Sequence, residues 1–126
     1  MIRYFDKFPY PDVEQITSKN KRVYLTPEGN RVPSVTTILS KTKDTTGLDK
    51  WVQSVGKEKA DKIRNEAANV GTSMHNFLEE HVTEIKRESF VPSPLHTQAK
   101  QMSDIIVNEG LKYVNEVWGA EVKLYH

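Results

Sequence analysis

The chain has 126 residues, of which 37% are hydrophobic and 28% are charged. This length fits one folded domain with a modest core and leaves no room for a second full domain. The absence of cysteine excludes disulfides, thiolate catalysis and cysteine-ligated metal centres, so a metal would have to bind through oxygen or imidazole. No apolar run approaches the roughly 20 residues of a membrane span, so we expect no membrane association and a reducing, cytoplasmic location.

The formal net charge is only +1, but basic residues concentrate in the N-terminal half and most of the acidic residues lie in the C-terminal half. Summed positive charge attracts phosphate, so the basic half is a candidate nucleic-acid surface. A solvated helix surface explains the same charge nearly as well. The cations that we assign to a nucleic-acid backbone are Arg31, Lys41, Lys43 and Lys50.

Residues 1–20 contain two prolines and show no sustained period, which predicts an extended arm. Its aromatic side chains are expected to pack onto the body of the protein, residues 21–126; they are Tyr4, Phe5, Phe8 and Tyr10. At the start of the body, Arg22–Leu25 and Arg31–Val32 flank a segment with the Pro and Gly that suit a turn. This pattern predicts a short β-hairpin.

Ser34 can cap a short helix after the hairpin, because its hydroxyl can accept a hydrogen bond from a free backbone N–H. This helix would turn inward the apolar residues Val35, Ile38 and Leu39. The β-branched Thr36 and Thr37 make a strand possible here too. The three hydroxyls of Ser34, Thr36 and Thr37 can contact DNA phosphate at a helix start, although as capping residues they need no ligand.

A polar connector, residues 41–47, precedes two helices. The first ends at Gly56 and carries apolar residues at helical spacing, namely Leu48, Trp51, Val52 and Val55. The second begins near Lys57 and ends near Asn69. Trp51 and Trp118 can stack on bases, but the helical face of Trp51 is typical of a core residue.

Gly71 is expected to break the helical pattern, and the next helix would extend to about Lys86. On this helix Thr72, His75 and Glu79 share one side, whereas an apolar stripe lines another. A histidine and a carboxylate facing a cleft is the layout of a metal-assisted site. A surface pair of His75 with Glu79 gives the same spacing, and Thr72 can simply cap the helix.

The remaining elements are a loop, a helix and a strand. Arg87–Leu95 contains two prolines and predicts a linker loop. From about His96, apolar residues at helical spacing predict a long helix; they are Ala99, Met102, Ile105, Ile106 and Leu111. The alternation around Gly119–Tyr125 predicts a terminal strand. The fold class expected is therefore α+β and mainly helical.

Four segments in this order resemble the N-terminal part of RecB-type PD-(D/E)XK nucleases, especially phage exonucleases and the mitochondrial genome maintenance exonuclease group. The segments are Arg31–Leu39, Leu48–Trp51, Gly71–His75 with Glu79, and Gly119–Tyr125. The Gly-Thr-x-x-His helix, preceded by Pro-Ser-Val-Thr-Thr-Ile-Leu, is the most specific piece. The resemblance spans roughly residues 20–126 and implies a restriction-endonuclease-like fold whose first core strand is the terminal strand.

The resemblance also implies a chemistry. It makes His75 a ligand of a catalytic Mg²⁺ or Mn²⁺ and gives Glu79 the role of a ligand or of a group that orients the imidazole. In the family, an Asp strand and an Asp/Glu-x-Lys strand follow the strand that Gly119–Tyr125 matches, and this sequence does not contain them. The expected protein is an N-terminal portion of a DNA exonuclease, inactive alone, acting on single strands or duplex ends in a bacterial or phage-infected cell.

Three alternatives stay open. Glu121-Val122-Lys123 matches Glu-x-Lys literally, so Glu121 and Lys123 could be catalytic groups of a compact site with His75 and Asp104, although Asp104 is predicted to lie in a helix. The chain could instead be a non-catalytic helical module that binds nucleic acid or a protein. It could also be a remnant whose exposed terminal strand pairs with a C-terminal half supplied by another chain.

Overall fold

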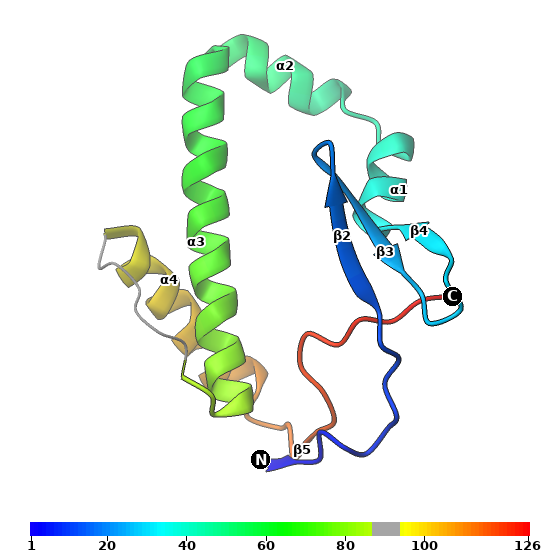
Figure 1. Cartoon of the computed structure of the whole chain (residues 1–126). Coiled ribbons are helices and arrows are strands. Elements are labelled where there is room, and N and C mark those ends of the chain that lie inside the picture. Colours follow the sequence, from blue (N-terminus) through cyan, green and yellow to red (C-terminus); the bar gives the residue numbers. More distant parts are fainter. Residues whose placement is uncertain (87–93) are drawn as a thin grey trace.

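The computed structural model of the chain describes residues 1–86 and 94–126. These residues form a mixed α+β structure with four α-helices and two small sheets, which confirms the fold class at this coarse level. In Figure 1 the three-stranded sheet and α1 lie on one side, while α3 with α4 packed on it lies on the other. Helix α2 joins the two sides at one end, and β5 lies at the opposite end. No helix in the described ranges is both long and apolar enough to cross a membrane.

Two antiparallel hairpins build the larger sheet, in which β3 (Lys21–Leu25) lies between β2 (Glu14–Ser18) and β4 (Arg31–Pro33). The hairpin of β3 and β4 confirms the prediction from sequence. The sequence does not predict β2, because the turn before β3 is Lys19-Asn20 and lacks glycine. Both turn residues have positive φ, 49° and 62°, which matches the twist of paired antiparallel strands.

Helix α1 (Val35–Thr42) begins as expected, because the Oγ of Ser34 accepts a hydrogen bond from the backbone N of Thr37 at 3.1 Å. The expectation that its apolar residues turn inward is wrong. Val35 is 70% exposed, and Ile38 and Leu39 are more than half exposed as well. The cause is topological: α1 follows an edge strand, and no described helix or strand packs extensively against it.

Helix α2 (Thr46–Val55) has the predicted extent, and Gly56 at φ 89° separates it from α3 (Lys57–Thr83). The predicted break at Gly71 is wrong, since α3 continues through it as one helix of 27 residues. A glycine inside a helix costs only about 1 kcal/mol relative to alanine, and the packing of α4 on α3 can offset that cost. Thr72 is therefore inside a helix and caps nothing.

Helix α4 (Pro94–Ile105) packs along α3 and ends in a π-helical turn, Ile106–Gly110. Ala99 and Ser103 are buried in this contact, whereas Met102 and Ile105 of the predicted apolar face are exposed. Small side chains occupy the contact because they let the two helix backbones approach. Most of the predicted loop Arg87–Leu95 lies outside the described residues.

The first and last parts of the chain meet in a parallel pair of two-residue strands, β1 (Ile2–Arg3) and β5 (Glu116–Val117). Next to this pair, the guanidinium of Arg3 reaches the C-terminal end of α3. Its Nε donates to the carbonyl of Val82 at 2.6 Å and its Nη2 to that of His81 at 3.1 Å. A cation at the last carbonyls of a helix is favoured by the helix dipole, so this contact fixes the strand pair on α3.

The C-terminal segment, residues 118–126, differs most from expectation. The predicted strand Gly119–Tyr125 is wrong, since the ordered pairing ends at Val117 and the residues after it are irregular. Glu121 has φ 53°, in the left-handed region, which bends the chain out of an extended path. The expected arm is also looser than predicted, because Tyr4, Phe5 and Phe8 are each at least 40% exposed.

Replacing Arg3 with methionine tests the junction with α3. Methionine keeps an apolar stem but removes the donors to the helix carbonyls, so we expect the free energy of unfolding to fall by about 1–2 kcal/mol. Urea denaturation followed by circular dichroism measures this change. The matched control is Arg31→Met, at an exposed arginine for which no ion pair is recorded in the described part of the chain. Equal losses in the two variants would contradict a special role for Arg3.

Candidate functional site

The candidate site is a hollow of about 580 Å³ between α3 and the C-terminal segment, here called the His75 hollow. Helix α3 supplies its polar wall and the C-terminal segment supplies the facing wall. The lining residues are Ala68, Gly71, Thr72, His75, Asn76 and Glu79 on α3, with Glu121 and Lys123 opposite. The structure thus brings together the four side chains that sequence analysis assigned to metal binding and catalysis.

The helical part of this site follows directly from the sequence. Thr72, His75 and Glu79 lie on one side of α3, with His75 exposed and Glu79 half-buried. Phe77 and His96 pack their rings 4.7 Å apart in the contact with α4. The apolar side of the helix therefore holds α3 in place while the polar side faces the hollow.

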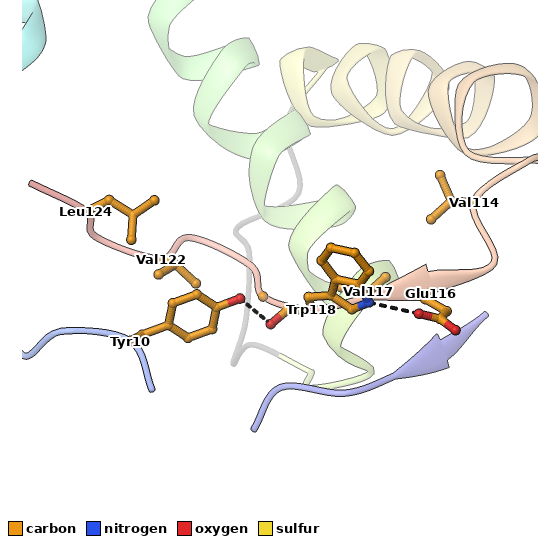
Figure 2. Close-up of a pocket in the computed structure, with 8 residues that line it drawn as sticks. Tyr10, Val114, Glu116, Val117, Trp118, Val122 and Leu124 are labelled. Atoms are coloured by element: carbon orange, nitrogen blue, oxygen red, sulfur yellow. Dashed lines mark hydrogen bonds between the residues drawn. The ribbon is translucent and has the colours of Figure 1, made fainter. Parts of the chain in front are cut away.

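The facing wall depends on how the C-terminal segment is held at its start. The hydroxyl of Tyr10 donates to the carbonyl of Trp118 at 2.6 Å, and the indole N–H of Trp118 donates to Glu116 at 2.9 Å (Figure 2). Gly119 lies so close to these groups that an added Cβ would be 2.6 Å from Val122 and 2.9 Å from the Tyr10 hydroxyl. A larger residue at this position would force the side chains of Val122 and Tyr10 to move.

The far end of the segment is held by Tyr125, whose hydroxyl donates to Oε1 of Glu28 at 2.6 Å. This hydrogen bond lowers the pKa of the Glu28 carboxyl and raises the pKa of the Tyr125 phenol. The segment also borders a second hollow of about 760 Å³, here called the α1 groove. Strands β3 and β4, the start of α1 and residues 122–126 line it, and Lys123 lines both hollows.

A divalent metal needs several oxygen or imidazole ligands that converge on one point. Among residues 1–86 and 94–126, no group of three or more His, Asp or Glu side chains converges in that way. Asp104 cannot join the His75 hollow as a fourth member of the compact site, because it lies on α4 and accepts a hydrogen bond from Lys100 at 2.6 Å. The described residues therefore do not make a complete metal site.

The residues predicted to contact DNA lie elsewhere, around α1 and α2. The hydroxyls of Ser34 and Thr37 are 2.8 Å apart and those of Ser34 and Thr36 are 3.0 Å apart, so the three join in one capping network. The capping role of Ser34 is confirmed, whereas Thr36 and Thr37 lie inside α1, and a phosphate contact of the three hydroxyls stays a prediction. The four predicted cations are all exposed; they are Arg31, Lys41, Lys43 and Lys50.

Sequence reasoning missed three residues of the hollow, namely Ala68, Gly71 and Asn76. Helical spacing points to all three, since positions 68, 71, 72, 75, 76 and 79 share one face of a single helix. The assumed break at Gly71 concealed this face.

Comparison of the chain with protein-family models, with curated proteins and with solved structures gives no match. The resemblance to nucleases therefore depends on the order and spacing of the four sequence segments alone.

Gly71 gives a sharp test of the continuous helix. A Cβ built there meets no heavy atom within 4 Å, so Gly71→Ala should raise the free energy of unfolding by about 1 kcal/mol. Thermal and urea denaturation measure this change. The same substitution at Gly119 should have the opposite effect. Gly119→Ala should lower the free energy of unfolding, because its Cβ would overlap Val122 and Tyr10. Destabilisation by Gly71→Ala would contradict both the helix and the open space beside it.

Proposed function

We propose that this chain is the N-terminal portion of a metal-dependent DNA exonuclease that hydrolyses phosphodiester bonds at single strands or duplex ends. One observation carries the proposal: His75 and Glu79 of α3 line the same hollow as Glu121 and Lys123 of the C-terminal segment. Imidazole, carboxylate and lysine are the groups that metal-assisted phosphodiester hydrolysis uses. The nuclease resemblance assigns the metal to His75 independently of this geometry.

The proposed enzyme is incomplete without further acidic ligands. Mg²⁺ prefers six oxygen-type ligands and Mn²⁺ accepts imidazole as well, whereas the hollow offers two carboxylates and one histidine that do not converge. The missing strands of the resemblance, one with Asp and one with Asp/Glu-x-Lys, would supply the rest from a C-terminal half. We accordingly propose that the 126 residues alone have little or no activity.

The small core supports a partner polypeptide. The buried apolar side chains in the described ranges are all valine or alanine: Val13, Ala60, Val70, Ala99 and Val117. Larger apolar side chains stay exposed on α1 and at Leu124, which is 72% exposed. Exposed apolar residues around one groove mark a surface that a further polypeptide can cover.

Binding of Mn²⁺ tests the role of His75 without requiring activity. Titrating Mn²⁺ should broaden the NMR signals of Thr72, His75 and Glu121 first, because the ion relaxes nuclei near it. His75→Ala should abolish this local broadening. The matched control is His81→Ala, on the same helix and also exposed, which should leave it unchanged. Broadening centred away from the hollow, or unaffected by His75→Ala, would exclude His75 as a ligand.

An assay for cleavage of labelled single-stranded DNA in the presence of Mn²⁺ tests the role of His75 in activity. Any cleavage by the chain, alone or mixed with a candidate C-terminal half, should fall in His75→Ala by more than the roughly 10- to 100-fold that loss of a ligand-orienting group costs, and should persist in His81→Ala. Equal cleavage by the two variants would contradict the proposed site.

A second candidate function is a non-catalytic module that binds nucleic acid. The exposure of Arg31, Lys41, Lys43 and Lys50 favours it, since none of the four has an ion pair recorded with another described residue. Free cations release counterions from nucleic acid when they bind phosphate. This candidate needs no metal and no partner half.

Salt dependence of binding tests the basic surface. For single-stranded DNA, each phosphate contact adds about −0.7 to the slope of log K against log salt concentration. Changing the four cations together to glutamine should therefore reduce the slope by about 3, measured by fluorescence anisotropy without metal. The control changes Lys57, Lys59, Lys62 and Arg64 on α3, with the same loss of charge, and should reduce it less. Equal reductions would show attraction to net charge rather than a defined surface.

A further inference from the structure

The C-terminal segment supplies Glu121 and Lys123, the wall of the His75 hollow that faces α3, but has no regular structure of its own. Residues 118–126 lie in no helix and no strand, and Glu121, Lys123 and Leu124 are exposed. Fixing an irregular segment costs conformational entropy for every residue that is ordered. Its position beside α3 must therefore come from specific contacts at a few points.

The hydrogen bonds that hold the segment lie at its two ends, and residues 122–126 also line the α1 groove with β3, β4 and the start of α1. At its start, Tyr10 binds the carbonyl of Trp118 and Phe8 packs edge-on against the indole with ring centroids 5.6 Å apart. At its end, Tyr125 binds Glu28. Within the described part of the chain, this contact is the one hydrogen bond or ion pair that joins residues 120–126 to the rest.

Glu28 is a suitable fixed point because its turn is rigid. The turn joins β3 to β4, and the buried Thr26 closes it: its Oγ1 accepts a hydrogen bond from the backbone N of Asn30 at 3.1 Å. The backbone N of Thr26 also donates to the carbonyl of Asn30 at 2.9 Å. A carboxylate on such a turn gives the phenol hydroxyl a defined partner, and hydrogen bonds to charged groups are stronger than neutral ones.

We propose that the hydrogen bond between Tyr125 and Glu28 is a clasp that positions Glu121 and Lys123 against His75. With the clasp closed, the segment is held at both ends and crosses the space between the His75 hollow and the α1 groove. With the clasp open, the segment keeps its hydrogen bond at Trp118 and its contacts along the α1 groove, but it loses the polar contact at its far end. An extended chain reaches about 3.3–3.6 Å per residue, so Lys123 could then leave the hollow entirely.

Tyr125 and Glu28 are thus positioning residues for the proposed site, and the inference rests on the proposed function only for the role of Glu121 and Lys123. Neither Tyr125 nor Glu28 lines the His75 hollow. Their effect on it would be exerted through the backbone between Tyr125 and Lys123. The geometry can be tested without metal or DNA, so a failed nuclease assay and a failed clasp are distinguishable.

Backbone NMR of the full chain tests the clasp. In Tyr125→Phe, the amide signals of Thr72, His75 and Asn76 should shift together with those of residues 121–126, and the order parameters of the segment should fall below about 0.6. The matched control is Tyr113→Phe, which removes a hydroxyl from a tyrosine that is 80% exposed and has no recorded hydrogen bond in the described part of the chain. It should leave both sets of signals unchanged.

Variants of Glu28 separate positioning from a general loss of structure. Glu28→Gln keeps a carbonyl oxygen that can accept from Tyr125 and should retain most of the order, whereas Glu28→Ala should match Tyr125→Phe. Unchanged signals of Ala99 and Ser103, buried between α3 and α4, show that the fold is intact in each variant. The proposal is overturned if the segment stays ordered in Tyr125→Phe, or if it becomes mobile while Thr72, His75 and Asn76 do not respond.

Discussion

The contact between Arg3 and the last carbonyls of α3 determines where the C-terminal part of the chain lies. The guanidinium donates to the carbonyls of His81 and Val82 and forms an ion pair with Glu84 at 3.2 Å. Because Arg3 also belongs to β1, the same residue places β5 beside the helix end through the parallel strand pair. The C-terminal segment leaves β5 next to α3 and passes toward the sheet, as Figure 1 shows. Together with the hydrogen bonds that Tyr10 and Tyr125 make at the two ends of the segment, this junction places Glu121 and Lys123 opposite the helix face that carries His75.

The parts of the fold that the sequence predicts well are those set by neighbouring residues. The hairpin of β3 and β4 follows from turn chemistry between two apolar runs, and α1 starts where Ser34 can cap it. The parts that it predicts poorly are set by distant contacts. The packing of α4 on α3 accompanies an unbroken helix at Gly71, and burial of α1 would need a neighbour that no local pattern reveals. Local propensity predicts the type of the central elements, α1 to α4 and the β3–β4 hairpin, but it fails for β2 and for the terminal segment and does not show which faces are buried.

The candidate site divides in the same way. Its helical half was predictable, because the spacing of Thr72, His75 and Glu79 defines one face of a helix. Its second part is hard to predict, because the alternation in Glu121-Val122-Lys123 is typical of an ordinary strand. The structure replaces that strand with a bend at Glu121, and the bend is possible because Gly119 allows Tyr10 and Val122 to close around it. Glu121 and Lys123, which match Glu-x-Lys literally, therefore line the hollow although they do not lie in a strand.

The charge of the His75 hollow constrains any chemistry there. The formal charges of Glu79, Glu121 and Lys123 sum to −1 when the imidazole of His75 is neutral. This charge balances only half the charge of a divalent ion. For the proposed nuclease, the balance must come from further carboxylates or from the phosphate of the substrate, whose oxygens can themselves bind the ion. If the phosphate supplies the missing negative charge, metal and DNA would bind the chain together more tightly than either alone. If further carboxylates supply that charge, the metal would bind first, and the polypeptide that carries these carboxylates would dock on the apolar surface around the α1 groove.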